Sequence, residues 1–139
     1  MIESIEIAPA AWDALLQHAA AAFPHECCGL LLGGEGRVVD AHRARNVAGD
    51  PRRRFRVDPE DHFAAIRRAR RDGLAVVGAY HSHPEGEPRP SETDLGEAIA
   101  DEEFIHVIVG PTRPGATPRI AAYCLITGNF VGVRLVRSS

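Results

Sequence analysis

The sequence contains 139 residues, of which 45% are apolar, and this combination is sufficient for one domain with one hydrophobic core. The net charge of -3 excludes the strongly basic surface of a typical nucleic-acid-binding protein. No lysine occurs, which excludes Schiff-base chemistry and a phosphate-binding loop that ends in Gly-Lys. We therefore expect a single domain over residues 1–139 with no nucleic-acid partner.

Apolar runs and cysteine content indicate the compartment. The chain has no run of about 18 apolar residues and no basic-then-apolar N-terminal leader, so no membrane partner is expected. The cysteines include the adjacent pair Cys27-Cys28 and fit neither a disulfide framework nor the paired spacing of a zinc knuckle. These features predict a soluble, cytoplasmic protein with buried, reduced thiols.

The first part of the chain predicts a strand, a helix and a hairpin. Residues 3–7 alternate in polarity as a short strand, and apolar residues then recur at helical spacing between Pro9 and Pro24. The apolar run 28–34 ends in glycines and predicts a buried strand, with 37–44 as its hairpin partner. Glu26 therefore stands directly before a buried strand.

The next part predicts a loop followed by a second helix. The segment Asn46–Arg54 is polar and contains glycine and proline, which predicts a mobile loop. Phe55 and Val57 resume a strand, and Asp58 is predicted to cap a helix over 59–73. The predicted apolar stripe of this helix comprises Phe63, Ile66 and Ala69.

The second half of the chain begins with the continuous apolar run 74–80, which is typical of a strand buried on both faces. A loop over 84–90 leads to a helix that begins at Ser91 and carries Leu95, Ala98 and Ile99. The remaining predicted elements are a strand over 104–109, a loop over Gly110–Pro118 and a closing hairpin of 120–126 with 130–136. Helices and strands mix along the chain, which predicts an α/β domain with a mixed central sheet flanked by helices.

The segment His81-Ser82-His83-Pro84 follows the buried strand and is the most informative motif. Side chains two residues apart on a strand point to one face, roughly 6 to 7 Å apart, so both imidazoles can reach one ion. Asp94 returns to the same region through a loop and the first turn of a helix. Two histidines and one aspartate form a three-ligand set, which leaves zinc a fourth position for water.

Each part of this pattern also has a structural interpretation. A His-X-His at a strand end is often incidental, and Ser91 with Asp94 fits the Ser-X-X-acid pattern of a helix start, so capping alone would explain that pair. Hydrolysis also needs a group that takes the proton from the metal-bound water, and a carboxylate that is not a ligand is the usual choice. Glu26 is a candidate, although glycine at position 29 breaks the His-Glu-X-X-His motif and a loop-end acid is the plainer interpretation.

Taken together, Glu26, His81-Ser82-His83, Ser91 and Asp94 resemble the signature of the JAMM (MPN-domain) zinc metalloprotease family. That signature is an upstream glutamate, then His-X-His, seven residues, Ser, two residues and Asp, and every position is filled. The resemblance covers roughly residues 3–136 and fits the compact bacterial type, because the long insertions of larger relatives are missing.

The resemblance implies a fold similar to that of the cytidine deaminases, with zinc held by His81, His83 and Asp94. It implies that Glu26 is the general acid/base and that Ser91 donates to the oxyanion. The implied reaction is hydrolysis of a peptide or isopeptide bond after the C-terminal tail of ubiquitin or a ubiquitin-like protein. Compact bacterial relatives are associated with sulfur-carrier proteins, so such a carrier is the expected substrate partner.

Two other functions stay open at this stage. A deaminase is one, but the Pro-Cys-X-X-Cys ligand pair that such enzymes need is missing. The other is a catalytically silent, zinc-binding module for protein interaction, against which the complete ligand set and Glu26 argue.

Overall fold

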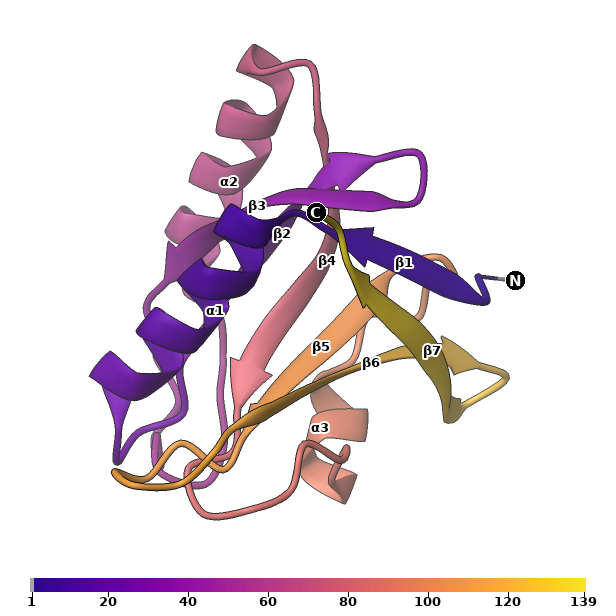
Figure 1. Cartoon of the computed structure of the whole chain (residues 1–139). Coiled ribbons are helices and arrows are strands. Elements are labelled where there is room, and N and C mark those ends of the chain that lie inside the picture. The colour runs from indigo at the N-terminus through magenta and orange to yellow at the C-terminus, as the bar shows by residue number, and fades with distance from the viewer. Residues whose placement is uncertain (1) are drawn as a thin grey trace.

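Seven strands form one mixed sheet, which curls until its two ends meet (Figure 1). The strand order is β1-β3-β2-β4-β5-β6-β7, and β1 pairs in parallel with both β3 and β7. This computed structural model describes residues 2–139. The strands are β1 Ser4–Ile7, β2 Cys28–Gly34, β3 Arg37–Ala44, β4 Ala75–Ser82, β5 Ile105–Gly110, β6 Arg119–Ile126 and β7 Asn129–Arg137. The predicted mixed sheet is confirmed, and its closure is an addition that the sequence did not reveal.

Three helices accompany the sheet: α1 Pro9–Ala22, α2 Pro59–Arg71 and α3 Glu92–Glu97. Helix α1 contacts β3, β4 and β5, whereas α2 contacts β2, β3 and β4. Helix α2 buries Ala65 and Ala69, whose small side chains permit close approach to the strands. The short α3 lies near the carboxyl end of β4 (Figure 1).

The hydrophobic core is divided by β2 and β4 into two clusters. Leu31 faces the cluster under α1, whereas Leu30 and Leu32 face the cluster under α2. Alternate side chains of a strand point to opposite faces, so a strand covered on both faces is apolar at every position. In β4, the buried Tyr80 faces the α1 side, where its hydroxyl lies 2.7 Å from Nδ1 of His18. Its neighbour His81 consequently faces the α2 side.

Three local predictions are wrong. Phe55 and Val57 do not form a strand, because only an isolated bridge joins Asn46 to Val57. Phe63 is 62% exposed and therefore does not belong to the buried stripe of α2. Helix α3 ends at Glu97, so the apolar Ile99 lies beyond it and is exposed.

The predicted burial of the thiols is confirmed. All three cysteines are free and buried, as expected for reduced thiols. Over residues 2–139, no helix is long and apolar enough to cross a membrane.

Candidate metal centre

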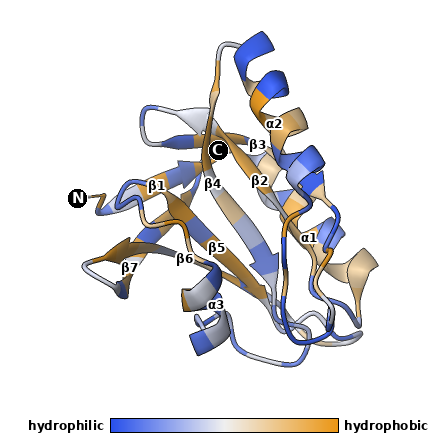
Figure 2. Ribbon diagram, turned by 180° about the vertical axis from the view of Figure 1, so that it is seen from behind, coloured by the Kyte–Doolittle hydropathy of each residue, from blue (hydrophilic) through white to orange (hydrophobic). Residues whose placement is uncertain are grey.

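The carboxyl end of β4 places two histidines on one side of the sheet. β4 pairs with β2 on one side and with β5 on the other, and His81 lies opposite both Cys28 and Ile108. The His83 amide continues this pairing by donating to the Val109 carbonyl over 2.8 Å. Two-sided pairing fixes the backbone here, and Figure 2 shows β4 turning from apolar to hydrophilic toward this end.

Three ligand atoms converge beyond this strand end. Nε2 of His81 lies 3.2 Å from Nε2 of His83, and Oδ2 of Asp94 lies 3.2 Å and 3.1 Å from these two atoms. Tetrahedral zinc with bonds of about 2.0 to 2.1 Å separates its ligand atoms by about 3.3 Å. The triangle therefore has the size that a single zinc ion requires.

The tautomer of His83 also favours a cation at this place. Its Nδ1 lies 2.9 Å from the Glu87 carbonyl oxygen, which can only accept, so Nδ1 carries the proton. In a neutral imidazole, Nε2 then presents a lone pair toward the Asp94 carboxylate and Nε2 of His81. This lone pair and the Asp94 carboxylate oxygen, 3.1 Å apart, repel each other, and a metal ion between them removes the repulsion. The donor set thus fits a metal.

Burial adjusts the charges of the ligand side chains. Burial lowers the pKa of His81, which keeps its imidazole neutral and able to bind a metal. Burial alone would raise the pKa of Asp94, but its close contacts with the His81 and His83 imidazoles and with the Ser91 amide hold the pKa of this carboxyl well below its usual range. Asp94 is therefore an anion, as a metal ligand must be.

The start of α3 holds Asp94 in place. The Ser91 amide donates to Oδ2 of Asp94 over 2.9 Å, and the Asp94 amide donates to Oγ of Ser91 over 3.0 Å. This capping box is the structural interpretation that the sequence left open, and it exists together with the contacts to the histidines. Because Oγ of Ser91 accepts in the box, its hydroxyl proton is free to point elsewhere.

Glu26 completes the cluster from the start of β2. One ligand atom each from Glu26, His81, His83 and Asp94 lie within 4.8 Å of one another. Glu26 is 5% exposed, and its Oε1 is buried with no hydrogen-bond partner among the described residues. Burial raises the pKa of Glu26 to about 8. A buried, unsatisfied carboxylate oxygen beside a ligand set is suited to contact a water molecule and to exchange a proton with it.

Residues 46–57 hold Glu26 through its backbone. The Glu26 amide donates to the Pro51 carbonyl over 2.7 Å, and Nδ2 of Asn46 donates to the Glu26 carbonyl over 3.0 Å. Nδ2 of Asn46 also donates to the Arg54 carbonyl, and its Oδ1 accepts from the amides of Ala48 and Arg56. The predicted mobile loop is thus closed by one asparagine side chain.

The same loop contacts a candidate ligand. The Phe55 ring stacks on His81 with centroids 4.2 Å apart and planes 16° from parallel. Sequence reasoning assigned no site role to Asn46 or Phe55. The only indication in the sequence was an asparagine at the start of a polar segment, and asparagine is also common in ordinary turns.

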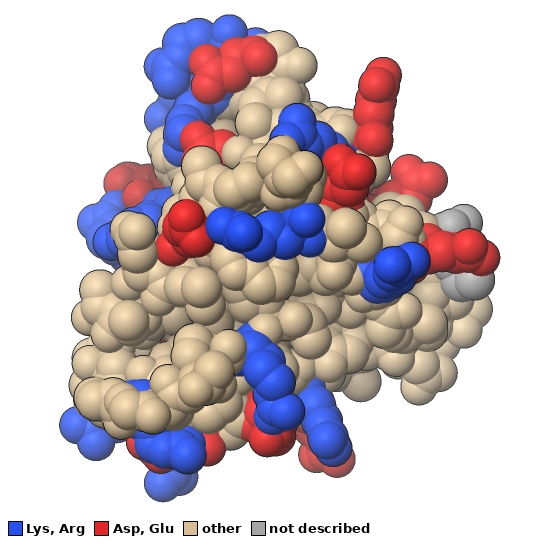
Figure 3. All heavy atoms as spheres, viewed as in Figure 1, with Lys and Arg blue, Asp and Glu red and all other residues tan. Residues whose placement is uncertain are grey.

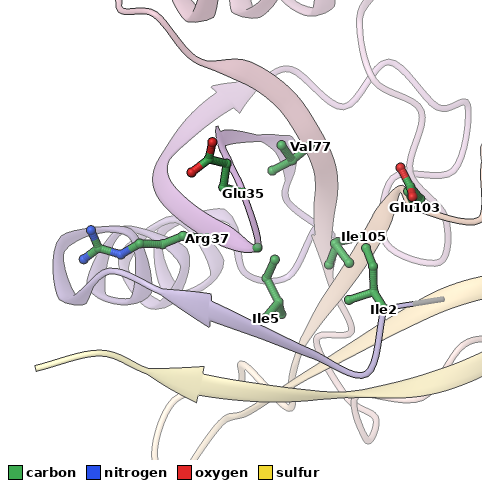
Figure 4. A pocket seen from close by; sticks show the side chains of 8 residues that line it. Ile2, Ile5, Glu35, Arg37, Val77, Glu103 and Ile105 are labelled. Atoms are coloured by element: carbon green, nitrogen blue, oxygen red, sulfur yellow. The ribbon is translucent and has the colours of Figure 1, made fainter.

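Hollows flank the cluster on two sides. One of about 630 Å³ is lined by Glu26, Asn46 and Val47 among others, and one of about 350 Å³ by Ser91, Leu95 and Phe130 among others. A third, of about 320 Å³, lies near the beginning of β4 at Val77, far along the strand from His81. Figure 4 shows it between Ile2, Ile5, Val77 and Ile105, with Glu35, Arg37 and Glu103 around it. It contains none of the candidate ligands.

Known sequences similar to this chain indicate one protein family. The model of the family described as prokaryotic homologs of the JAB domain matches residues 8–123. A desampylase of Haloferax volcanii is 37% identical over 113 residues, which are 77% of this chain and 81% of that protein. The CysO-cysteine peptidase of Mycobacterium tuberculosis is 28% identical over 84% of this chain and 79% of its own length. Tail tip assembly protein K of Escherichia phage N15 is 36% identical over 99 residues, and the match spans only 38% of that protein.

Solved structures agree with this result. The solution structure of a protein from Salinibacter ruber superimposes with a TM-score of 0.73 at 39% identity, and the match covers 97% of this chain and 92% of that one. A JAB1/MPN domain protein from Archaeoglobus fulgidus superimposes with a TM-score of 0.60 at 24% identity over 96% of this chain and 98% of that one, a likeness of fold.

Proposed function

Because the chain belongs to the family of prokaryotic homologs of the JAB domain, the compact prokaryotic JAMM group, we propose that it is a metallopeptidase acting on ubiquitin-like sulfur carriers. It hydrolyses a peptide or isopeptide bond that follows the C-terminal tail of such a carrier. The observation that carries this proposal is the convergence of Glu26, His81, His83 and Asp94, which combines a three-ligand set with a buried carboxylate that has no other partner.

Zinc is the proposed metal, with His81, His83 and Asp94 as its ligands. Two nitrogen donors and one carboxylate are a usual set for catalytic zinc, and the triangle has the expected size. Bound zinc would supply Lewis acidity, which polarises a carbonyl and lowers the pKa of water.

Glu26 and Ser91 have separate roles in the proposed reaction. Glu26 takes a proton from the attacking water and delivers it to the leaving nitrogen, because its carboxylate lies within the cluster and its Oε1 has no hydrogen-bond partner among the described residues. Ser91 uses its hydroxyl proton, which the capping box does not engage, to stabilise the oxyanion. The buried surroundings of both groups strengthen these interactions by excluding water.

The relatives and the shape of the sheet support a protein tail as substrate. Desampylase and CysO-cysteine peptidase are names for cleavage of carrier conjugates. β3 pairs with β1 only at Arg37 and Val38, so its backbone over 39–44 has no strand partner on that edge. This edge ends at the hollow that contains Glu26, which supports strand addition by an extended tail. A reducing, cytoplasmic location fits the three free thiols and stays a prediction.

The test is cleavage of a fusion in which a carrier tail precedes a reporter domain. We expect cleavage at the end of the carrier, loss of activity after chelation and recovery with one equivalent of zinc per chain. Elemental analysis and mass spectrometry of the products provide the measurements. A protein that binds zinc and cleaves no carrier fusion would instead be the silent interaction module.

A further inference from the structure

Four arginines lie on one short segment beside the candidate site and have no acidic partner. We define the arginine loop as residues 52–56, which carries Arg52, Arg53, Arg54 and Arg56. All four are exposed, and among residues 2–139 none of them forms a salt bridge. Of the other twelve arginines, six are paired with acids: Arg37, Arg45, Arg68, Arg71, Arg119 and Arg137.

The density of positive charge on this segment contrasts with the charge of the whole protein. The protein has a net charge of -3, and Figure 3 shows charges of both signs interspersed over one face. Four unpaired like charges on five consecutive residues repel one another unless an anionic surface approaches them. The local charge is thus opposite in sign to that of the whole chain.

The arginine loop is held at the rim of the site. Asn46 fixes its backbone by donating to the Arg54 carbonyl and accepting from the Arg56 amide, each over 3.0 Å. Phe55, in the middle of the loop, stacks on His81. A tail that reaches Glu26 therefore passes close to this loop, because the Glu26 amide donates to Pro51 next to it and Phe55 contacts His81.

The geometry points to a docking surface: the arginine loop binds an acidic face on the folded part of the ubiquitin-like substrate. This inference rests on the proposed function and specifies the surface chemistry of its partner. Rim charges of this kind act chiefly on association and on its salt dependence, because exposed ion pairs are screened by salt. The loop is then a determinant of substrate affinity rather than of the chemical step.

The experiment compares two charge-reversal variants of the zinc-loaded protein. Arg52→Glu/Arg54→Glu changes the loop, and Arg67→Glu/Arg70→Glu makes the same change in charge on the exposed face of α2. These α2 arginines also lack a salt bridge in the described chain and lie toward the end of the helix that is remote from His81. The substrates are a fusion of an acidic ubiquitin-like sulfur carrier and a peptide containing only its tail and the residues that follow.

We expect the loop variant to raise KM for the fusion by about 10-fold, with kcat within twofold of wild type. KM for the tail peptide rises far less, since the peptide lacks the folded part. The control variant changes neither KM appreciably. Increasing the salt concentration from 50 to about 300 mM should weaken wild-type binding and remove most of the difference between the variants.

Two results would overturn the inference. If the loop and control variants raised KM for the fusion equally, the arginines would act only through the net charge of the protein. If the loop variant left KM for the fusion unchanged, the loop would not contact the carrier. Failure of wild-type protein to cleave both fusion and peptide would instead refute the proposed function, so the two failures are distinct.

Discussion

The metal-ligand segment and the Glu26 segment form the two halves of one site but are stabilised by different means. His81 and His83 are fixed by strand pairing, and Asp94 by a capping box, so this half spans few residues and uses regular structure. Glu26 precedes its strand and is held by hydrogen bonds with Asn46 and Pro51, which lie further along the chain. Regular structure positions the proposed ligands, whereas an irregular loop positions the proposed proton carrier.

The largest expected effects are losses of activity in Asp94→Asn and Glu26→Gln, and the metal content of the two variants should differ. Asp94→Asn should empty the metal site and remove activity, because the amide lacks the charge that the ligand requires. Glu26→Gln should retain the metal and lose on the order of 10²-fold or more in kcat, because an amide cannot accept the proton. Zinc content and turnover are measured on both variants. A Glu26→Gln protein without zinc would place Glu26 among the ligands.

Ser91→Ala tests the residue that joins helix capping to chemistry. We expect zinc to remain and kcat to fall by on the order of 10²-fold, through loss of the oxyanion donor. Loss of the cap should also cost about 1 kcal/mol in the free energy of unfolding. Ser91→Thr, which keeps a hydroxyl, is the control. If Ser91→Ala lost stability and kept full turnover, the serine would serve only as a cap.

Asn46→Ala should disturb the Glu26 segment and leave the metal-ligand segment intact. It should lower the free energy of unfolding by about 2 kcal/mol, because backbone groups around the loop lose their partners. The ligands are on other elements, so zinc content should be close to wild type while kcat falls. Asn46→Asp retains the acceptor and loses the donor to Glu26, which should give an intermediate loss. Zinc loss in Asn46→Ala would mean that the two halves are not independent.

Chelation tests whether the fold depends on the bound metal. Since the core clusters form without the ligands, metal removal should lower the melting temperature and leave the far-ultraviolet circular dichroism close to that of the loaded protein. Unfolding on chelation would show that the metal organises the core itself.

A further expected effect is a pH dependence of stability in the metal-free protein. Burial raises the pKa of Glu26 from 4.5 to about 8, so between these values the folded state binds more protons than the unfolded state. The stability linked to this group is complete below pH 4.5 and is lost as the pH rises through about 8. Glu26→Gln does not titrate. Its stability relative to wild type should therefore increase between pH 5 and pH 8.5 in denaturant unfolding, and a constant difference would contradict the raised pKa.

The same division explains what the sequence predicted. The β4 strand and its histidines were predictable because buried strands and His-X-His spacing are local patterns, and residues 28–34 and 37–44 matched β2 and β3. The role of Asn46 was not predictable, because its side chain contacts residues 26, 51 and 54, which no periodic pattern links. Closure of the sheet was also missed, since β1 has four residues and pairs with both β3 and β7.

That closure has a consequence for synthesis on the ribosome. β1 is made first, yet one of its partners is β7, over Arg134–Arg137. Until residue 137 has emerged, β1 and β6 each have an exposed edge, even though the β2–β4 region is already available to fold. A nascent chain arrested before β7 should thus be protease-sensitive at β1, and one arrested well beyond it should be resistant.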